Sequence, residues 1–305
     1  MKHIYLFLIT LLLGVLLFAC AGAEKMGDYE YELMDDGTAT ITRYNGNETE
    51  LVIPAEIDGH GVTGIANGAF FENRDLMSVI IPDGMMSIGD GAFFSCYHLT
   101  SVTIPDTVIS IGNRAFESCS LTSVDIPDSV VSIGYLAFAV CSNLTNVSIP
   151  DSVTTIGINP FLDCRKMMSI QTLPDHSILA SIDGVLFSKM DKQLICYPCA
   201  KADTTYSIPD GIRIIGMYSF YDCDNIMSVT IPDSVTSIES DAFSHCNNLS
   251  SVTIPDSVTS IGNNAFDWCS DILVINVPRD SYAAQYCKEN GLNYTYPDAD
   301  DWLNN

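Results

Sequence analysis

Basic side chains are scarce in this chain. It has 13 Lys and Arg residues against 38 Asp and Glu residues, which gives a formal net charge of −25 at pH 7. A field of that sign repels phosphate backbones and anionic lipid headgroups. The composition therefore argues against nucleic acid and acidic membrane surfaces as partners, and it permits cationic partners.

Motifs that carry catalysis are also lacking. The chain contains no G-x-S-x-G, H-E-x-x-H or phosphate-binding loop. Its five histidines are scattered, and none shares a repeat position with a nearby nucleophile. No second ligand recurs beside the cysteines at metal-binding spacing. We expect no catalytic residues, no metal and no cofactor, and therefore a protein that is not an enzyme.

Long hydrophobic runs are absent except at the N-terminus, where residues 4–18 are apolar. The run follows Lys2 and precedes small residues in which Ala21-x-Ala23 fits a signal-peptidase site. It is shorter than the about 20 residues that a membrane span requires. We predict a signal peptide over residues 1–23, no membrane span, and a secreted or cell-surface protein.

The same segment contains a candidate lipidation site. Leu17-Phe18-Ala19-Cys20 resembles a bacterial lipoprotein box, in which Cys20 carries the lipid. Phe18 departs from the small or β-branched residue expected at its position. Free secretion is favoured, and a lipid anchor on Cys20 is the alternative.

One pattern, an aliphatic residue followed by proline, recurs along most of the chain. The prolines of these pairs are Pro54, Pro82, Pro105, Pro127, Pro150, Pro174, Pro209, Pro232, Pro255 and Pro278. Most neighbours are 22 to 24 residues apart, and the exceptions are intervals of 28 residues after Pro54 and 35 after Pro174. A fixed period in the twenties is typical of a solenoid, in which each unit packs only on its neighbours. The pattern predicts a β-rich solenoid of about ten coils.

Each repeat contains the elements of one coil. Leu99-x-x-Val102-x-Ile104 has the spacing of a leucine-rich-repeat strand, and Pro105 ends its ladder because proline has no N–H. Val108-x-x-Ile111 returns across the other face, and Gly112 is expected in a left-handed corner. Ala115-Phe116-x-x-Cys119 fits a short helical or 3₁₀ turn that points its apolar side inward.

The segments at the two ends differ from the repeat. Residues 29–43 are predicted to form a β-hairpin around Asp35-Asp36-Gly37, within an N-terminal cap over residues 24–50. A short helix is predicted from Ser281 to Asn290, ended by Gly291, within a C-terminal cap and tail over residues 279–305. Such caps cover the open edges that otherwise favour end-to-end association, and we expect a monomer.

The solenoid itself is predicted over residues 51–278, with one irregular repeat at about residues 174–208. There Gly184 to Tyr197 has the pattern of two strands around a polar turn. We expect this hairpin to project from the solenoid.

The repeat closely resembles the BspA-like leucine-rich repeats of secreted and surface proteins. The matching text, Leu-x-Ser-Val-x-Ile-Pro-Asp-Ser-Val-x-Ser-Ile-Gly-x-x-Ala-Phe-x-x-Cys, is almost unbroken at residues 99–119, 226–246 and 249–269. The resemblance implies a non-enzymatic adhesion module that binds an extracellular protein, either of the host matrix or of a microbial surface. The alternative is a structural cell-envelope protein without a defined ligand.

Most of the cysteines occupy one position of the repeat. They are Cys96, Cys119, Cys141, Cys164, Cys223, Cys246 and Cys269. We expect free thiols in the core, although neighbouring coils are close enough for disulfides. Cys196-Tyr-Pro-Cys199 is the only C-x-x-C. It is a candidate disulfide that holds the irregular repeat, and a redox pair is the less favoured alternative.

Two rows of polar residues are predicted on the surface. Aspartates follow most of the prolines, where turn chemistry explains them better than Ca²⁺ binding does. The exposed position between the two inward strand residues holds Ile80, Thr103, Asp125, Ser148, Thr230 and Thr253. We predict ligand binding at the polar members of this stripe, with a merely solvated sheet as the alternative. No aromatic platform for sugars is apparent.

Overall fold

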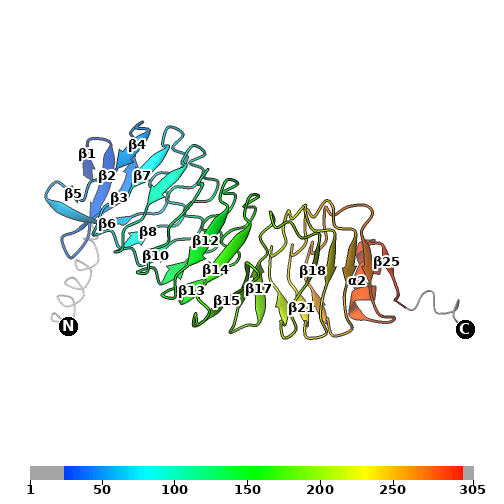
Figure 1. Ribbon diagram of the computed structural model, residues 1–305. Coiled ribbons are helices and arrows are strands. Elements are labelled where there is room, and N and C mark those ends of the chain that lie inside the picture. The colour runs from blue at the N-terminus through cyan, green and yellow to red at the C-terminus, as the bar shows by residue number, and fades with distance from the viewer. Residues whose placement is uncertain (1–23, 298–305) are drawn as a thin grey trace, which may run out of the picture.

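Two short segments of most repeats form strands, and successive coils stack these strands into parallel ladders (Figure 1). The computed structural model describes residues 24–297. The predicted signal peptide, Cys20 within it, and residues 298–305 of the predicted tail lie outside the described residues. The chain winds through about 11 turns, so the predicted β-solenoid is confirmed.

The first ladder is formed by the Ser-Ile segment of each repeat. Ile111 pairs in parallel with Ile88 on one side and with Ile133 on the other. Each of these isoleucines is 1% exposed, because alternate residues of a strand point inward. The strands are β6 (His60–Ile65), β8 (Ser87–Ile88), β10 (Ser110–Ile111), β11 (Ser132–Ile133) and β13 (Thr155–Ile156), and beyond the irregular repeat β19 (Ile214–Ile215), β21 (Ser237–Ile238) and β23 (Ser260–Ile261).

The second ladder is formed by the segment that ends at the repeated proline. Its strands also pair in parallel and in register, as Val229 of one coil does with Val252 of the next. The strands are β4 (Glu50–Val52), β7 (Ser78–Ile80), β9 (Ser101–Thr103), β12 (Asn146–Ile149), β14 (Ser169–Thr172), β18 (Thr205–Ser207), β20 (Ser228–Thr230), β22 (Ser251–Thr253), β24 (Val274–Asn276) and β25 (Tyr294–Thr295).

A turn joins the two strands of each coil and also ties the coil to its neighbour. The N–H of Val108 donates to the carbonyl of Pro105 at 3.1 Å, so the proline is the first residue of the turn. The hydroxyl two residues after the proline reaches back one coil. Ser129 Oγ donates to the carbonyl of Val108 at 2.7 Å, and Thr107 Oγ1 donates to that of Met85 at 2.7 Å.

The expected left-handed corner at Gly112 is wrong. Positive φ angles occur instead at Arg114 (55°) and Ser118 (61°) of the same coil. Gly112 is placed where the preceding coil passes closely, since a Cβ there would lie 2.6 Å from the backbone nitrogen of Asp90. Close approach of two coils, rather than backbone handedness, accounts for this glycine.

The interior contains a column of stacked aromatic rings. Phe93 and Phe116 have ring centroids 5.2 Å apart with an interplanar angle of 3°, and Phe116 and Phe138 follow at 5.4 Å. The column is interrupted after Phe161 and resumes at Tyr197. The buried residues accordingly divide into two core clusters, and Figure 1 shows the coils of the two halves tilted relative to each other around β15 and β17.

The irregular repeat lies at this interruption. Its strands β15 (Leu179–Ile182), β16 (Val185–Ser188) and β17 (Gln193–Cys196) pair antiparallel, and β17 continues into the C-terminal half by pairing with β19. The predicted two strands are present, but the expectation that they project is wrong. All four residues of β16 are buried, because the apolar side chains complete the core where the regular coils stop.

Both ends have the predicted secondary structure. β1 (Glu24–Met26), β2 (Tyr29–Leu33) and β3 (Ala39–Tyr44) are antiparallel, β5 (Glu56–Ile57) pairs with β6, and β3 joins the first ladder through β6. Helix α2 (Tyr282–Asn290) begins after Ser281, whose hydroxyl accepts from the N–H of Ala284, and ends at Gly291 with φ 68°. The capping role of these segments stays a prediction.

Candidate functional site

The predicted stripe lies on the outward side of the second ladder. Its inward neighbours, such as Val229 and Val252, are at most 1% exposed. The five polar residues of the predicted stripe are Thr103, Asp125, Ser148 and Thr230, which are exposed, and Thr253, which is half-buried. Strand alternation therefore places the four hydroxyl residues where a partner can contact them. Asp125 is also exposed, but its segment forms no strand.

The structure arranges these residues in three groups, because the strands of the second ladder belong to three sheets. Thr230 is directly opposite Thr253 in the parallel ladder, and Thr103 is opposite Ile80. Ser148 is separated from Thr230 by the irregular repeat, because β14 ends one sheet and β18 begins another. The stripe is thus divided into three shorter rows, and Asp125 lies between the first two on a segment that forms no strand.

Sequence reasoning missed three members of the rows. Gln171 is the register partner of Ser148, Ser207 that of Thr230, and Asn276 that of Thr253. Asn276 and Ser207 could have been found, since each stands two residues before a repeated proline, as Thr103 does. Gln171 was hidden because its segment has one extra residue before Pro174.

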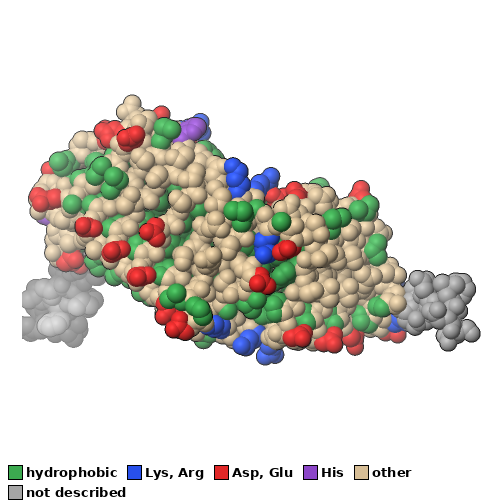
Figure 2. All heavy atoms as spheres, viewed as in Figure 1, with side chains coloured by type: hydrophobic (Ala, Val, Ile, Leu, Met, Phe, Trp, Pro, Cys, Tyr) green, Lys and Arg blue, Asp and Glu red, His purple; other side chains and the backbone are tan. Residues whose placement is uncertain are grey.

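The stripe offers hydrogen-bonding groups and a single carboxylate. Within residues 24–297, the hydroxyls of Thr103, Thr230 and Thr253 form no hydrogen bond. They are therefore available to a partner that lies across the strands. Figure 2 shows acidic side chains distributed along both halves of the visible face, with basic ones gathered near the middle.

The cysteine column consists mostly of free thiols, as expected, but the expectation is wrong for Cys223, which forms a disulfide. Cys96 Sγ donates to the carbonyl of Phe70 at 3.1 Å, and Cys119 Sγ to that of Phe93 at 3.2 Å. Burial raises the pKa of the Cys96 thiol to about 12, and it raises the pKa of Cys119 well above its usual range. Nucleophilic thiolate is suppressed at these positions.

The candidate disulfide between Cys196 and Cys199 is wrong. Cys199 is bonded to Cys223 of the next coil, with Cα atoms 4.5 Å apart, and Cys196 is a free thiol. The reason is side-chain direction, because Cys196 ends strand β17 with its side chain in the core, 3% exposed. Cys199 follows Pro198 and faces the column position of the neighbouring coil. The bond therefore joins the irregular repeat to the C-terminal half.

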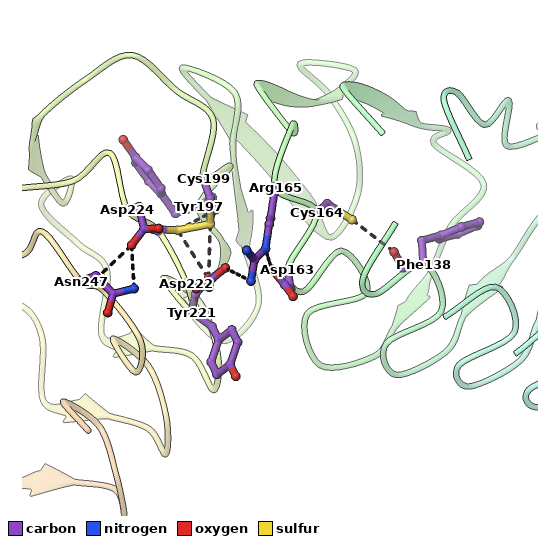
Figure 3. A network of polar contacts seen from close by, with 11 residues as sticks. Phe138, Asp163, Cys164, Arg165, Tyr197, Cys199, Tyr221, Asp222, Asp224 and Asn247 are labelled. Atoms are coloured by element: carbon purple, nitrogen blue, oxygen red, sulfur yellow. Dashed lines mark hydrogen bonds and ion pairs between the residues drawn. A yellow bond between two sulfur atoms is a disulfide. The ribbon is translucent and has the colours of Figure 1, made fainter. Parts of the chain in front are cut away.

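A polar network surrounds this disulfide and spans the interruption (Figure 3). The Arg165 guanidinium contacts Asp163 Oδ1 at 2.9 Å and Asp222 Oδ2 at 2.7 Å. Burial, followed by the neighbouring Asp163, raises the pKa of Asp222 to about 6. Arg165 thereby links the last regular coil of the N-terminal half to a coil of the C-terminal half.

A surface row of aromatic rings, half-buried at Tyr221 and His245, could not be seen in the sequence. Tyr221 and His245 have ring centroids 5.1 Å apart, and His245 stacks on Trp268 at 6.0 Å. Trp268 is 75% exposed. The signal was weak because Tyr221 occupies a different position of its repeat from His245 and Trp268, and only the folded turn brings the three together.

In residues 24–297 no group of three or more His, Cys, Asp or Glu side chains is placed to hold a metal ion. Over the same residues, no helix has both the length and the apolar character needed to cross a membrane.

Stacked coils, a strand just before most of the repeated prolines and a column of buried phenylalanines define a leucine-rich-repeat solenoid. The model of the BspA type leucine rich repeat region, in six copies, matches residues 63–192 and 196–294. The chain belongs to this family. Its members are typically surface proteins, and the family and fold are typically non-enzymatic. No curated protein matches the chain significantly.

Solved structures with this fold come from several bacteria. A leucine rich cell surface protein of Faecalibacterium prausnitzii is 28% identical, with a TM-score of 0.61, and the match covers 93% of this chain and 97% of that one. A leucine-rich repeat protein of Eubacterium ventriosum is 27% identical, with a TM-score of 0.63 and coverage of 85% and 72%. The pneumococcal vaccine antigen PcpA, at 19% identity, has a TM-score of 0.65 with coverage of 84% and 81%, and shows likeness of fold alone.

Proposed function

We propose that this chain is an exported, non-enzymatic adhesion module that binds a protein of the host matrix or of a microbial surface. The observation that carries the proposal is the stripe, where exposed hydroxyls repeat in register on parallel strands and have no partner within the described residues. Membership in a family of surface proteins supports the location. The similar Faecalibacterium prausnitzii structure, described as a cell surface protein, supports it as well.

The stripe would bind by contact across several coils. Each coil contributes one small polar side chain, and the separation of neighbouring strands, about 4.8 Å, sets the spacing of those contacts. Individual hydrogen bonds contribute about 1 kcal/mol each, so useful affinity requires several coils together. The net charge of −25 favours a partner with a basic surface.

The test is binding of the purified chain to immobilised matrix proteins such as fibronectin and collagen, and to intact bacteria. In the double variant T230K/T253K, two lysines are added to the stripe. The matched control, T236K/T259K, adds the same charge to the same two coils. Its lysines stand directly before strands β21 and β23 of the first ladder, away from the stripe. We expect binding to fall in the first variant and to persist in the second.

Equal binding of both variants would remove the stripe as the site. The single variant T103K then shows whether the row that contains Thr103 takes part. Absence of binding to every surface tested would favour the structural envelope protein over the adhesion module.

Export is tested by the mature N-terminus. Cleavage after Ala23 leaves Glu24 as the first residue, whereas lipid anchoring leaves a modified Cys20. Cell fractionation with intact-mass measurement distinguishes the two. Light scattering coupled to size exclusion tests the proposed monomer.

A further inference from the structure

The first ladder ends abruptly at β13. This strand is the last in a sheet of nine strands, and its only strand partner is β11. In each preceding coil, the side of the strand that faces the following coil is hydrogen bonded to that coil. For example, the N–H of Gly157, just after β13, donates to the carbonyl of Ile133 in β11 at 2.8 Å. Within residues 24–297, no strand pairs with the other side of β13.

The direction of the unused groups follows from strand geometry. The N–H of Thr155 donates to the carbonyl of Val131 at 3.1 Å, so the polar groups of Thr155 point toward β11. The N–H and C=O of the next residue, Ile156, therefore point the opposite way. That edge of β13 lines a cavity of about 260 Å³, here called the junction cleft, whose other wall is the irregular repeat.

The junction cleft has apolar walls. Ile156 is half-buried, although its counterparts Ile111 and Ile133 are each 1% exposed. Ile178 and Ile195 contribute from the irregular repeat. The interruption of the core thus leaves part of the isoleucine column accessible.

Two polar groups of the junction cleft are hydrogen-bond acceptors. Asn159 is 2% exposed, and its Nδ2 donates to the carbonyl of Tyr218 at 2.8 Å. Its buried Oδ1 accepts no hydrogen bond from residues 24–297. Asp191 lies on the opposite wall, where its carboxylate is hydrogen bonded to Ser188. A ligand that fits should bring N–H donors, an apolar side chain and no negative charge.

We propose that the junction cleft binds an extended peptide segment of another protein, which adds to β13 as a further strand. Main-chain hydrogen bonds to the edge at Ile156 hold the segment, and alternate side chains fill the apolar walls. The Asp191 carboxylate in the wall of the junction cleft favours a segment with Lys or Arg beside its aliphatic residues. This site goes beyond the stripe, because it lies on the other ladder.

The probe is a set of fluorescent heptapeptides, Lys-Thr-X-Thr-X-Thr-Lys, in which each X is Val, Ile, Leu or Phe. Fluorescence polarisation with the wild-type chain measures binding. Each peptide has a matched control with an N-methyl group on the central threonine and another with Glu in place of both Lys. We expect at least one Lys-flanked peptide to bind and its N-methylated form to bind about tenfold more weakly, since a backbone hydrogen bond is lost.

Protein variants test the same contact from the other side. Ile156→Pro removes the outward N–H, which an edge position tolerates, and Ile156→Ala keeps it while removing the same side chain. We expect I156P to bind about tenfold more weakly than I156A, and Asp191→Lys to transfer the preference to the Glu-flanked peptide. Circular dichroism checks that each variant is folded.

The proposal is overturned if no heptapeptide binds, if N-methylation has no effect, or if I156P and I156A bind equally. The chain could also form concentration-dependent dimers that persist in T230K/T253K and are lost in I156P. Such dimers would show that a second copy of this chain occupies the junction cleft, and this result also overturns the proposal. Failure here leaves binding at the stripe unaffected, because T230K/T253K reports on that site separately.

Discussion

Phe93 lies almost parallel to Phe116 of the next coil, with ring centroids 5.2 Å apart and an interplanar angle of 3°. Both rings are fully buried. Each ring therefore packs on the coil before it and on the coil after it, so the stability of one coil depends on its neighbours. An isolated repeat lacks those contacts, and stacking is what makes the repeat fold.

The first prediction concerns this column. Phe93→Ala should lower the free energy of unfolding by about 3–5 kcal/mol, because it leaves a cavity between two rings. The matched control is Phe94→Ala, since Phe94 is half-buried on the outside of the same turn and stacks only on Phe71. We expect about 1 kcal/mol for the control. Urea denaturation followed by circular dichroism measures both, and equal losses would contradict a core held by the inner column.

Much of this architecture follows from the repeat itself. The inward positions of Val102, Ile111 and Phe116 could be predicted because burial imposes the same residue at the same place in each coil. Thr103 and Thr230 were placed on the outward face by strand alternation alone. A periodic sequence specifies a periodic structure, and here it specifies which of these side chains face the core.

The interruption could not be predicted in the same way. The 35-residue interval after Pro174 shows that the repeat changes, but its sequence does not say how the strands are packed. The burial of β16 and the disulfide between Cys199 and Cys223 both depend on contacts between coils. The irregular segment changes those contacts. Such contacts are nonlocal, and no neighbouring copy of the repeat provides a template for them.

A second prediction concerns the bond that ties successive turns. Ser129→Ala removes the donor to the carbonyl of Val108 and should cost about 1 kcal/mol. Ser123→Ala, at an exposed serine of the same coil with no hydrogen bond from its hydroxyl within the described residues, should cost close to nothing. The comparison uses the midpoint of urea unfolding. A midpoint shared by S129A and S123A would mean that this inter-coil bond contributes no net stability.

A third prediction concerns the sulfur atoms. Peptide mapping without reduction should recover Cys199 linked to Cys223. In the native protein at neutral pH, iodoacetamide should leave Cys96 and Cys119 unmodified, because burial raises the pKa of both thiols. Both should be alkylated in urea. A fragment linking Cys196 to Cys199, or rapid native alkylation of Cys96, would contradict the observed arrangement.

The last prediction is a pH dependence that arises at the interruption. Burial and Asp163 raise the pKa of Asp222 from an ordinary 3.8 to about 6, so between these values the folded chain keeps a proton that the unfolded chain has released. The contribution of Asp222 to stability is therefore greatest below about pH 4 and is lost as the pH rises through about 6. Asp222→Asn cannot titrate.

The stability of D222N relative to wild type should accordingly improve as the pH rises from about 4 to 7, when urea midpoints are compared at each pH. Asp233→Asn is the matched control, because Asp233 is exposed and its carboxylate forms no hydrogen bond or ion pair within the described residues. D233N should follow the wild-type profile. If instead D222N loses stability relative to wild type over this range, the ion pair with Arg165 outweighs the burial of Asp222, and the network would act as a clamp at neutral pH.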